Sequence, residues 1–300
     1  MDCIHCRGKA GFEGKISFAF QPIVDVTTRT VFAQEALVRG PNGEPARSVL
    51  TPLTDETRYS FDQAARTTAI ALASRLMPHC TTRLSINILP NAIYNPVRCL
   101  RTTLHAADEY GFSQSRLMFE ATEHEQVQDV EHMRRIFDHY GKCGFTTAID
   151  DFGAGFAGLA LLADFRPDII KIDRGLVTDV ERDPTRQAII SGIKSTADIL
   201  GTTVVAEGVE TLAEFRFLRQ VGVTLFQGYL FARPAFEALP TVDWSALDAP
   251  GEGEQATGEP RQRRRSTVRP AAPSDEERSF PVDARPGGGN SAAPAMEADC

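Results

Sequence analysis

Residues 146–173 read TTAIDDFGAGFAGLALLADFRPDIIKID, two apolar β-type runs joined by a glycine-containing loop and a short helical stretch after Gly158. The runs TTAIDDF and DIIKID are typical of buried parallel strands, and each carries charged residues near its C-terminal end. On both sides of this segment the sequence continues to alternate β-rich runs with longer amphipathic stretches. This alternation predicts a parallel sheet connected by crossover helices.

Eight such runs are present before residue 232. The predicted strands are ISFAFQPIV (16–24), VFAQEALV (31–38), LSINIL (84–89), RLMFEAT (116–122), TTAIDDF (146–152), DIIKID (168–173), TVVAEGV (203–209) and LFQGYLF (225–231). Helices are predicted around residues 59–77, 91–110, 127–140, 185–200 and 212–221. The number and order of these elements predict an α/β fold, a TIM-type (β/α)8 barrel. Only DVTTRT (25–30) separates the first two strands, too few residues for a helix, so we expect the first strand to be antiparallel.

Length and composition narrow the class of protein. The chain has 300 residues, 42% of them hydrophobic and 24% charged, which excludes collagen-like and wholly disordered proteins. A formal net charge of -8 argues against binding duplex nucleic acid through a basic face. No run approaches the roughly 20 apolar residues of a membrane span, and the start MDCIHCRGKAGFEGK lacks the apolar middle of a signal peptide. We therefore expect a cytoplasmic protein.

The two ends of the chain differ from the middle. Six scattered cysteines indicate reduced thiols, and Cys3-x-x-Cys6 with His5 favours an unstructured start over a zinc site because no second pair exists. Residues 251–300 contain six Gly, six Pro and almost no large apolar side chains, so we predict a disordered tail. Its run Arg263–Arg265 is either solvated or contacts an acidic partner, and solvation is favoured. The expected division is an extension (1–15), one barrel domain (16–245) and the tail (246–300).

Polar residues collect where the predicted strands end. They are Glu35, Asn87, Glu120, Asp150, Asp151, Lys171, Glu207, Glu210 and Gln227. The C-terminal ends of barrel strands share one rim, where barrel enzymes build their sites. So many acids at one rim would repel one another unless cations neutralised them, and oxygen ligands suit Mg²⁺ or Mn²⁺. Two such ions would serve phosphoester hydrolysis.

The two adjacent aspartates, Asp150 and Asp151, can share one site only if the backbone bends between or beside them. Neighbouring residues in a regular strand point to opposite faces, so Asp150 and Asp151 reach one metal cluster only where the backbone turns. We expect Gly153-Ala154-Gly155 to supply that turn.

Eight segments in order, AFQPIVD, EALVR, SINI, FEATE, AIDDFGAGF, IIKID, VVAEGVE and FQGYLFARP, carry a family resemblance. They resemble the signature of EAL-domain cyclic di-GMP phosphodiesterases, over about residues 16–240. The resemblance implies a barrel with one antiparallel strand, two Mg²⁺ or Mn²⁺ ions, and hydrolysis of cyclic di-GMP to linear pGpG. It also suggests a homodimer.

Roles for individual residues follow from the resemblance alone. It implies that Glu35, Asn87, Glu120 and Asp150 ligate a first metal, that Asp151 bridges toward a second, and that Glu207 adds a further carboxylate. Lys171 would orient the attacking water, acting with Glu35 and Glu207 in catalysis. Gln21 and Arg39 would hold the nucleotide, Gln227 would position water or ligand with Glu210 nearby, and Glu123 would support the loop after the aspartates.

Several alternatives stay open. Glu210 and Gln227 could be structural caps, Lys171 could pair only with Asp173, and Arg39 could be a surface cation. Many family members have two serines where this chain has Ala157-Gly158 after Phe156, and the region after Arg39 also departs from the usual spacing. Both changes concern loop ordering rather than metal ligands. A receptor that binds cyclic di-GMP without cutting it is the main functional alternative, and a barrel that only scaffolds protein contacts is a third. A regulatory protein partner is compatible with all three.

Overall fold

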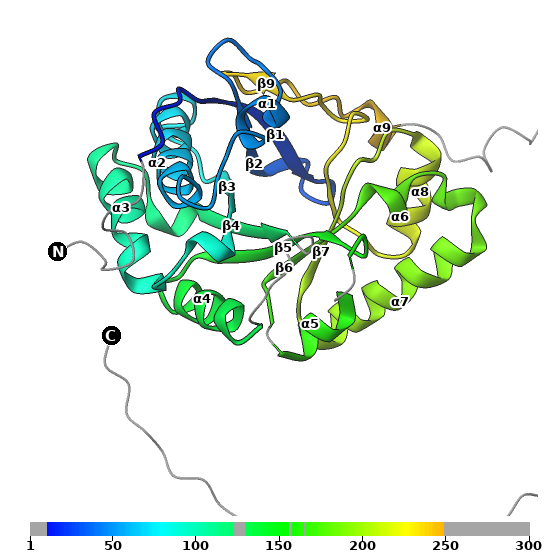
Figure 1. Ribbon diagram of the computed structural model, residues 1–300. Coiled ribbons are helices and arrows are strands. Elements are labelled where there is room, and N and C mark those ends of the chain that lie inside the picture. The colour runs from blue at the N-terminus through cyan, green and yellow to red at the C-terminus, as the bar shows by residue number, and fades with distance from the viewer. Residues whose placement is uncertain (1–10, 123–129, 156–157, 165, 249–300) are drawn as a thin grey trace, which may run out of the picture. The chain divides into compact units, whose positions relative to one another are not determined.

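A computed structural model describes residues 11–122, 130–155, 158–164 and 166–248 of the chain. Its strands are β1 (Ser17–Asp25), β2 (Thr30–Arg39), β3 (Arg83–Ile88), β4 (Leu117–Thr122), β5 (Thr146–Phe152), β6 (Ile169–Ile172), β7 (Thr203–Ala206), β8 (Leu225–Phe226) and β9 (Ala235–Phe236). Strands β2 to β8 follow one another as parallel neighbours, and β1 closes the sheet by pairing with both β8 and β2 (Figure 1). The predicted (β/α)8 barrel is confirmed.

The first strand runs against the rest, as its short connection requires. β1 pairs antiparallel with β2 along its whole length, from Ser17↔Arg39 to Asp25↔Thr30. The Asp25 carboxylate accepts a hydrogen bond from the backbone N–H of Thr27 at 2.8 Å, and Arg29 adopts a left-handed φ of 54°. These features close the tight hairpin turn made by residues 26–29, which lie between the two strands.

The eighth strand is shorter than predicted. Only Leu225–Phe226 pairs with β7, and the chain then turns at Gly228. The backbone there packs so closely on Val209 that a β-carbon at Gly228 would collide with the Val209 carbonyl. Two hydrogen bonds hold the turn, from Val209 N to Gln227 O at 3.1 Å and from Leu230 N to Val209 O at 3.0 Å. β9, which was not predicted, then pairs with the first half of β1.

The helices surround the barrel (Figure 1). They are α1 (Ala46–Leu50), α2 (Arg58–Leu76), α3 (Pro96–Glu109), α4 (Val130–Lys142), α5 (Gly158–Asp164), α6 (Arg174–Val177), α7 (Pro184–Leu200), α8 (Leu212–Gln220) and α9 (Ser245–Asp248), with 3-10 turns η1 (Pro90–Ala92), η2 (Gln114–Arg116) and η3 (Val180–Arg182). α3 begins later than predicted because Asn95 caps it and Pro96 takes its first position. The short α1 and α6 were not predicted.

The barrel interior is filled by one layer of apolar side chains. This layer comprises Ile23, Ala33, Met118, Ala148, Ile169, Val205 and Leu225. In β2 and in β4 to β8, the residue that belongs to this layer lies two positions before a residue predicted at the rim. Side chains two positions apart on a strand point to the same side, so the layer residue and the rim residue both face the barrel interior. These apolar side chains therefore lie directly beneath the polar rim.

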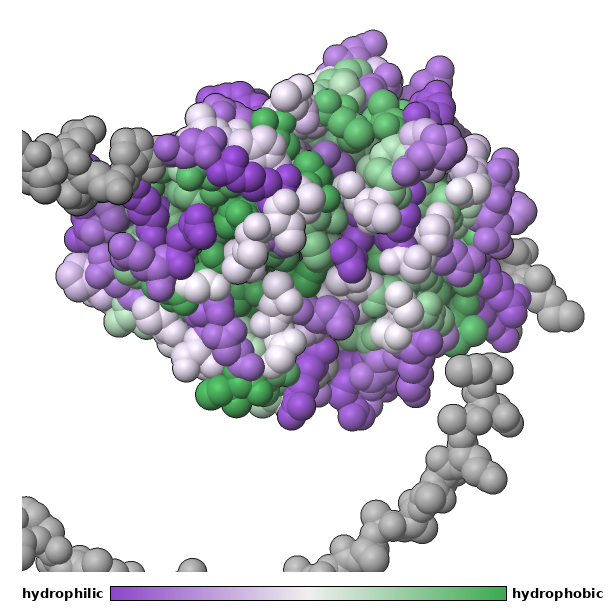
Figure 2. All heavy atoms as spheres, turned by 180° about the vertical axis from the view of Figure 1, so that it is seen from behind, coloured by the Kyte–Doolittle hydropathy of each residue, from purple (hydrophilic) through white to green (hydrophobic). Residues whose placement is uncertain are grey.

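The outer surface is mixed in polarity. Figure 2 shows the face opposite to that of Figure 1, where apolar side chains lie in patches separated by hydrophilic ones. Among the described residues, no helix is both long enough and apolar enough to cross a membrane.

Candidate active site

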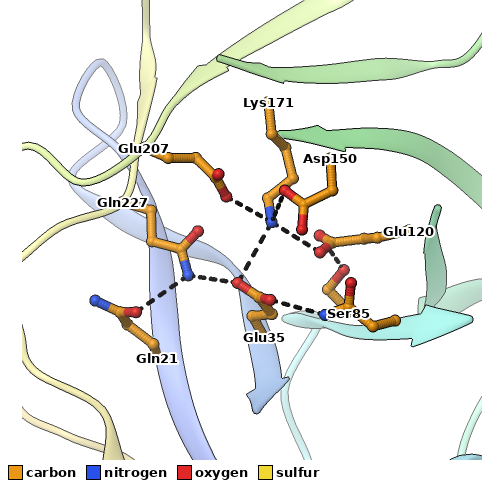
Figure 3. A network of polar contacts seen from close by, with 9 residues as sticks. Gln21, Glu35, Ser85, Glu120, Asp150, Lys171, Glu207 and Gln227 are labelled. Carbon is orange, nitrogen blue, oxygen red and sulfur yellow. Dashed lines mark hydrogen bonds and ion pairs between the residues drawn. The ribbon is translucent and has the colours of Figure 1, made fainter. Parts of the chain in front are cut away.

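The polar side chains of the rim meet around one lysine. Lys171, on β6, is fully buried, and its Nζ lies 2.7 Å from Glu120 Oε2, 3.0 Å from Asp150 Oδ1, 2.6 Å from Glu207 Oε1 and 3.4 Å from Glu35 Oε2 (Figure 3). Burial alone would lower the pKa of Lys171, but these carboxylates raise it well above its usual value. The lysine is therefore held as a cation. Asp173 instead caps α6 by accepting a hydrogen bond from Gly175 N, so the alternative pairing of Lys171 with Asp173 is wrong.

One cation does not balance four acids. Desolvation raises the pKa of Glu120 to about 8, with Lys171 opposing the rise and Glu35 and Asp150 adding to it. Desolvation likewise raises the pKa of Glu207 well above its usual value, and Lys171 again opposes the rise. Where carboxylates are largely removed from water, those in excess of cations take up protons unless further positive charge is supplied.

The carboxylates form two clusters of the kind that hold metal ions. Oxygen atoms of Glu35, Glu120 and Asp150 lie within 4.8 Å of one another, and so do those of Asp150, Asp151 and Glu207. Asp150 belongs to both clusters. A donor set made only of carboxylate and amide oxygens fits hard divalent ions such as Mg²⁺ or Mn²⁺. The excess of acids and this donor set therefore fit divalent metal ions.

Asp150 and Asp151 share the site because the strand is irregular there. β5 pairs regularly with β6 up to Ile149↔Ile170, then shifts register and resumes at Phe152↔Ile172. Within the irregularity Asp151 adopts a left-handed φ of 53°, which is unusual for a residue other than glycine. The turn expected at Gly153–Gly155 thus begins two residues earlier, at Asp151 itself.

Amide side chains orient Glu35. Asn87 Nδ2 donates to Glu35 Oε1 at 2.9 Å, and Gln227 Nε2 donates to Glu35 Oε2 at 2.7 Å (Figure 3). Gln227 also lies 3.4 Å from Gln21 Oε1, and Gln21 Nε2 donates to the carbonyl of Ala232 at 3.1 Å. Gln227 is therefore tied to the site itself rather than serving as a cap of the next turn.

A cavity of about 260 Å3 opens over these groups, and its wall carries an arginine that sequence reasoning missed. Arg174, the first residue of α6, lines the cavity and pairs with Glu210 at 2.8 Å. Glu210 is not a cap, because Glu214 Oε2 accepts the backbone N–H groups of Glu210 and Thr211. Arg174 directly follows the IIKID run, so its place at a strand end was the available signal.

Arg39, predicted to hold the nucleotide, is not among the residues that line the cavity. The Arg39 guanidinium turns back to its own strand and donates to the carbonyls of Val38 at 2.8 Å and Leu37 at 3.4 Å. Glu123 lies outside the described residues, as do Phe156 and Ala157 of the altered loop, the Cys3/Cys6 pair and residues 249–300 of the predicted tail, whereas its first residues, 246–248, belong to α9. The roles predicted for Arg39 and Glu123 stay predictions.

Comparison with known proteins gives a consistent result. The EAL domain family model matches residues 10–234. The chain is 34% identical over 227 residues to the blue light- and temperature-regulated antirepressor BluF of Escherichia coli (strain K12), covering 76% of this chain and 56% of that protein. It is 32% identical over 233 residues to the probable cyclic di-GMP phosphodiesterase PdeG of the same strain, covering 74% and 45%. The chain thus spans about half the length of these curated relatives.

Solved structures with the same architecture include ligand complexes. A standalone versatile EAL protein from Vibrio cholerae O395, in its c-di-GMP bound form, has a TM-score of 0.76 and 48% identity, over 80% of this chain and all of the other. The manganese/cy-diGMP complex of Klebsiella pneumoniae BlrP1 at pH 9.0 has a TM-score of 0.71 and 36% identity, over 79% of this chain and 62% of the other.

Proposed function

The chain belongs to the EAL domain family, and we propose that it is a phosphodiesterase that uses two divalent metal ions to hydrolyse cyclic di-GMP to linear pGpG. The observation that carries this proposal is the pair of carboxylate clusters sharing Asp150 at the barrel rim. Relatives named as cyclic di-GMP phosphodiesterases and a neighbour solved with manganese and cyclic di-GMP support the substrate and the metal class. Mg²⁺ and Mn²⁺ are both suitable ions for this donor set.

The residues divide between two metal positions. Glu35, Asn87, Glu120 and Asp150 would hold the first ion, and Asp151 and Glu207 would hold the second together with Asp150. When bound, the ions would polarise a phosphoryl oxygen and lower the pKa of water at the site. The protein would fix their spacing through strand register, which is why the irregularity that turns Asp151 inward matters for the reaction.

Lys171 would orient the attacking water. Its Nζ lies among the carboxylates of both clusters, so it would donate to a water there in exchange for one of these carboxylate partners. Because the neighbouring carboxylates keep it charged, it would donate to that water rather than accept its proton. A carboxylate of the rim, Glu35 or Glu207, would then receive the proton.

The substrate would lie in the cavity above the ions. A cyclic dinucleotide carries two phosphates, and an acid-rich wall repels them unless cations intervene. Arg174 can contact one phosphate by releasing Glu210, since a guanidinium binds phosphate well. Gln21 and Gln227 would position the ligand from the opposite side, and Arg39 would assist only after turning from its backbone partners.

A non-hydrolysing receptor is the second candidate, favoured by one observation: the 34% identical relative is named as an antirepressor. In that case the rim would bind cyclic di-GMP, and a protein partner would detect the bound state. Homodimerisation is a further proposal that rests on the family resemblance, and cytoplasmic location and a regulatory partner are proposals as well.

Chromatography of cyclic di-GMP incubated with the protein and Mn²⁺ separates the two candidates. The phosphodiesterase should yield pGpG, and EDTA should stop the reaction. Binding of cyclic di-GMP with no pGpG after long incubation in Mn²⁺ or Mg²⁺ would contradict the enzyme and favour the receptor.

A further inference from the structure

An ion pair is buried on α2, away from the rim, and the proposed reaction does not use it. Asp62 and Arg66 lie one helical turn apart, and their side chains are at most 1% exposed. The Arg66 guanidinium bonds to Asp62 Oδ2, and its Nη1 donates to Thr103 Oγ1 on α3 at 3.1 Å. Charges are rarely buried this deeply unless they are paired, and here the two charges cancel.

The second oxygen of Asp62 reaches the barrel. Asp62 Oδ1 accepts a hydrogen bond from the backbone N–H of Leu89 at 3.1 Å. Leu89 is the first residue after β3, and its last strand pairing is one residue earlier, at Ile88↔Ala121. Its N–H therefore points beyond the sheet ladder, where a buried donor requires an acceptor. The next residue, Pro90, has no N–H and starts the η1 turn.

This contact lies two residues from a predicted metal ligand. Asn87, on the same strand end, donates its Nδ2 to Glu35 Oε1 at 2.9 Å. The hydrogen bond from Leu89 to Asp62 restrains the chain directly after the end of β3, two residues from Asn87. The Leu89 carbonyl also accepts a hydrogen bond from Ala92 N at 2.9 Å, so the Asp62 contact acts beside this turn and the sheet pairings that stop at Ile88.

We propose that Asp62 is a positioning residue, which anchors the end of β3 through Leu89 so that Asn87 and Glu35 are set for the first divalent ion. Arg66 neutralises Asp62 and holds it in place, which lets a carboxylate act as a buried backbone acceptor. The inference rests on the proposed function only in requiring that the rim binds a cation. Groups that hydrogen-bond directly to metal ligands change metal affinity by about 10- to 100-fold when lost, and Asp62 acts one step further out, so we expect an effect at the lower end of this range.

The test is a matched pair of double variants. Removing either charge alone would leave the other buried and unpaired, which can unfold the protein. Asp62→Asn with Arg66→Met removes both charges but keeps an amide oxygen that can accept the Leu89 N–H. Asp62→Leu with Arg66→Met removes both charges and the acceptor, with a side chain of similar length. Mn²⁺ affinity is measured directly from the electron paramagnetic resonance signal of unbound Mn²⁺, and thermal unfolding is recorded for each protein in EDTA.

The expected result is that the Leu variant binds Mn²⁺ about tenfold more weakly than the Asn variant, and that the Asn variant stays within about threefold of wild type. Mn²⁺ affinities of the two variants within threefold of each other would overturn the positioning role, whatever their melting temperatures. Failure of wild type to bind Mn²⁺ would overturn it as well. A wild-type protein that binds Mn²⁺ but does not cleave cyclic di-GMP would contradict the proposed function and leave the positioning role standing.

Discussion

Glu35 contacts three polar side chains at the rim. Its two oxygens accept from Asn87 and Gln227, and Lys171 lies 3.4 Å away. Glu35→Ala would remove a metal ligand and leave two amides without their acceptor. We expect hydrolysis to fall below detection mainly through loss of metal, with Mn²⁺ affinity reduced by at least about tenfold. The exposed Glu109→Ala is the matched control. Normal turnover by Glu35→Ala at saturating Mn²⁺ would contradict the assignment.

Arg174 and Arg39 are the two candidates for contacting a phosphate of the substrate. Only Arg174 lines the cavity, whereas Arg39 bonds to its own backbone. We therefore expect Arg174→Ala to raise the KM for cyclic di-GMP by about tenfold, corresponding to one charge-assisted hydrogen bond, and Arg39→Ala to raise it less. Steady-state kinetics at saturating Mn²⁺ measures both. A larger effect at Arg39 would show that its side chain turns into the cavity when substrate binds.

Glu120 should make the free energy of unfolding depend on pH, and the direction of the change follows from its raised pKa. Burial raises its pKa to about 8 from the usual 4.5, so without metal the folded state binds more protons than the unfolded state between those values. The free energy of unfolding should therefore fall as pH rises from about 5 to 8. A bound metal replaces the proton and should flatten this slope. Urea denaturation in EDTA and in Mn²⁺, with Glu120→Gln as control, checks it. The same slope in wild type and Glu120→Gln, both in EDTA, would contradict the account.

At the level of elements, the barrel was predictable because its signals are local and repeated. Apolar runs of strand length, and a connection between the first two strands that is too short for a helix, each act within a few residues. The strand-end carboxylates were predictable for the same reason. A barrel brings every strand end to one rim, so position along the chain is sufficient to place them.

What could not be predicted depends on contacts between distant segments. The register shift that turns Asp151 inward is set by pairing with β6, and nothing in DDFG alone places the bend at Asp151 rather than at Gly153. Asp62 and Arg66 on α2 resemble a solvated charge pair in the sequence, because helical spacing does not show which face is covered. The orientation of Arg39 is likewise invisible to sequence reasoning.

The turn after β8 offers a test at this scale. A β-carbon at Gly228 would collide with the backbone of Val209, in the segment between Glu207 and Glu210. We expect Gly228→Ala to cost at least about 2 kcal/mol of unfolding free energy and to lower activity, since packed backbone cannot yield as a side chain can. Gly141→Ala, in α4 with open space around it, should be neutral or stabilising by about 0.5–1 kcal/mol. Equal stability of the two variants by urea denaturation would show that the turn is looser than described.

For the whole molecule, the composition of the chain separates the barrel from the residues after Pro250. The segment 251–300 contains few side chains able to form a core. We expect truncation after Pro250 to leave the melting temperature and specific activity nearly unchanged. A large loss of either would show that these residues contribute to the stability or chemistry of the barrel.

In the proposed reaction, the rim directs a water molecule to one phosphodiester bond of cyclic di-GMP. The most direct test is mass spectrometry of the product formed in water enriched in oxygen-18. The expected product is pGpG with one oxygen-18 atom on its terminal phosphate, formed in the presence of Mn²⁺ and not in EDTA. Substrate that stays uncleaved after prolonged incubation with Mn²⁺, or a product without oxygen-18, would contradict this reaction.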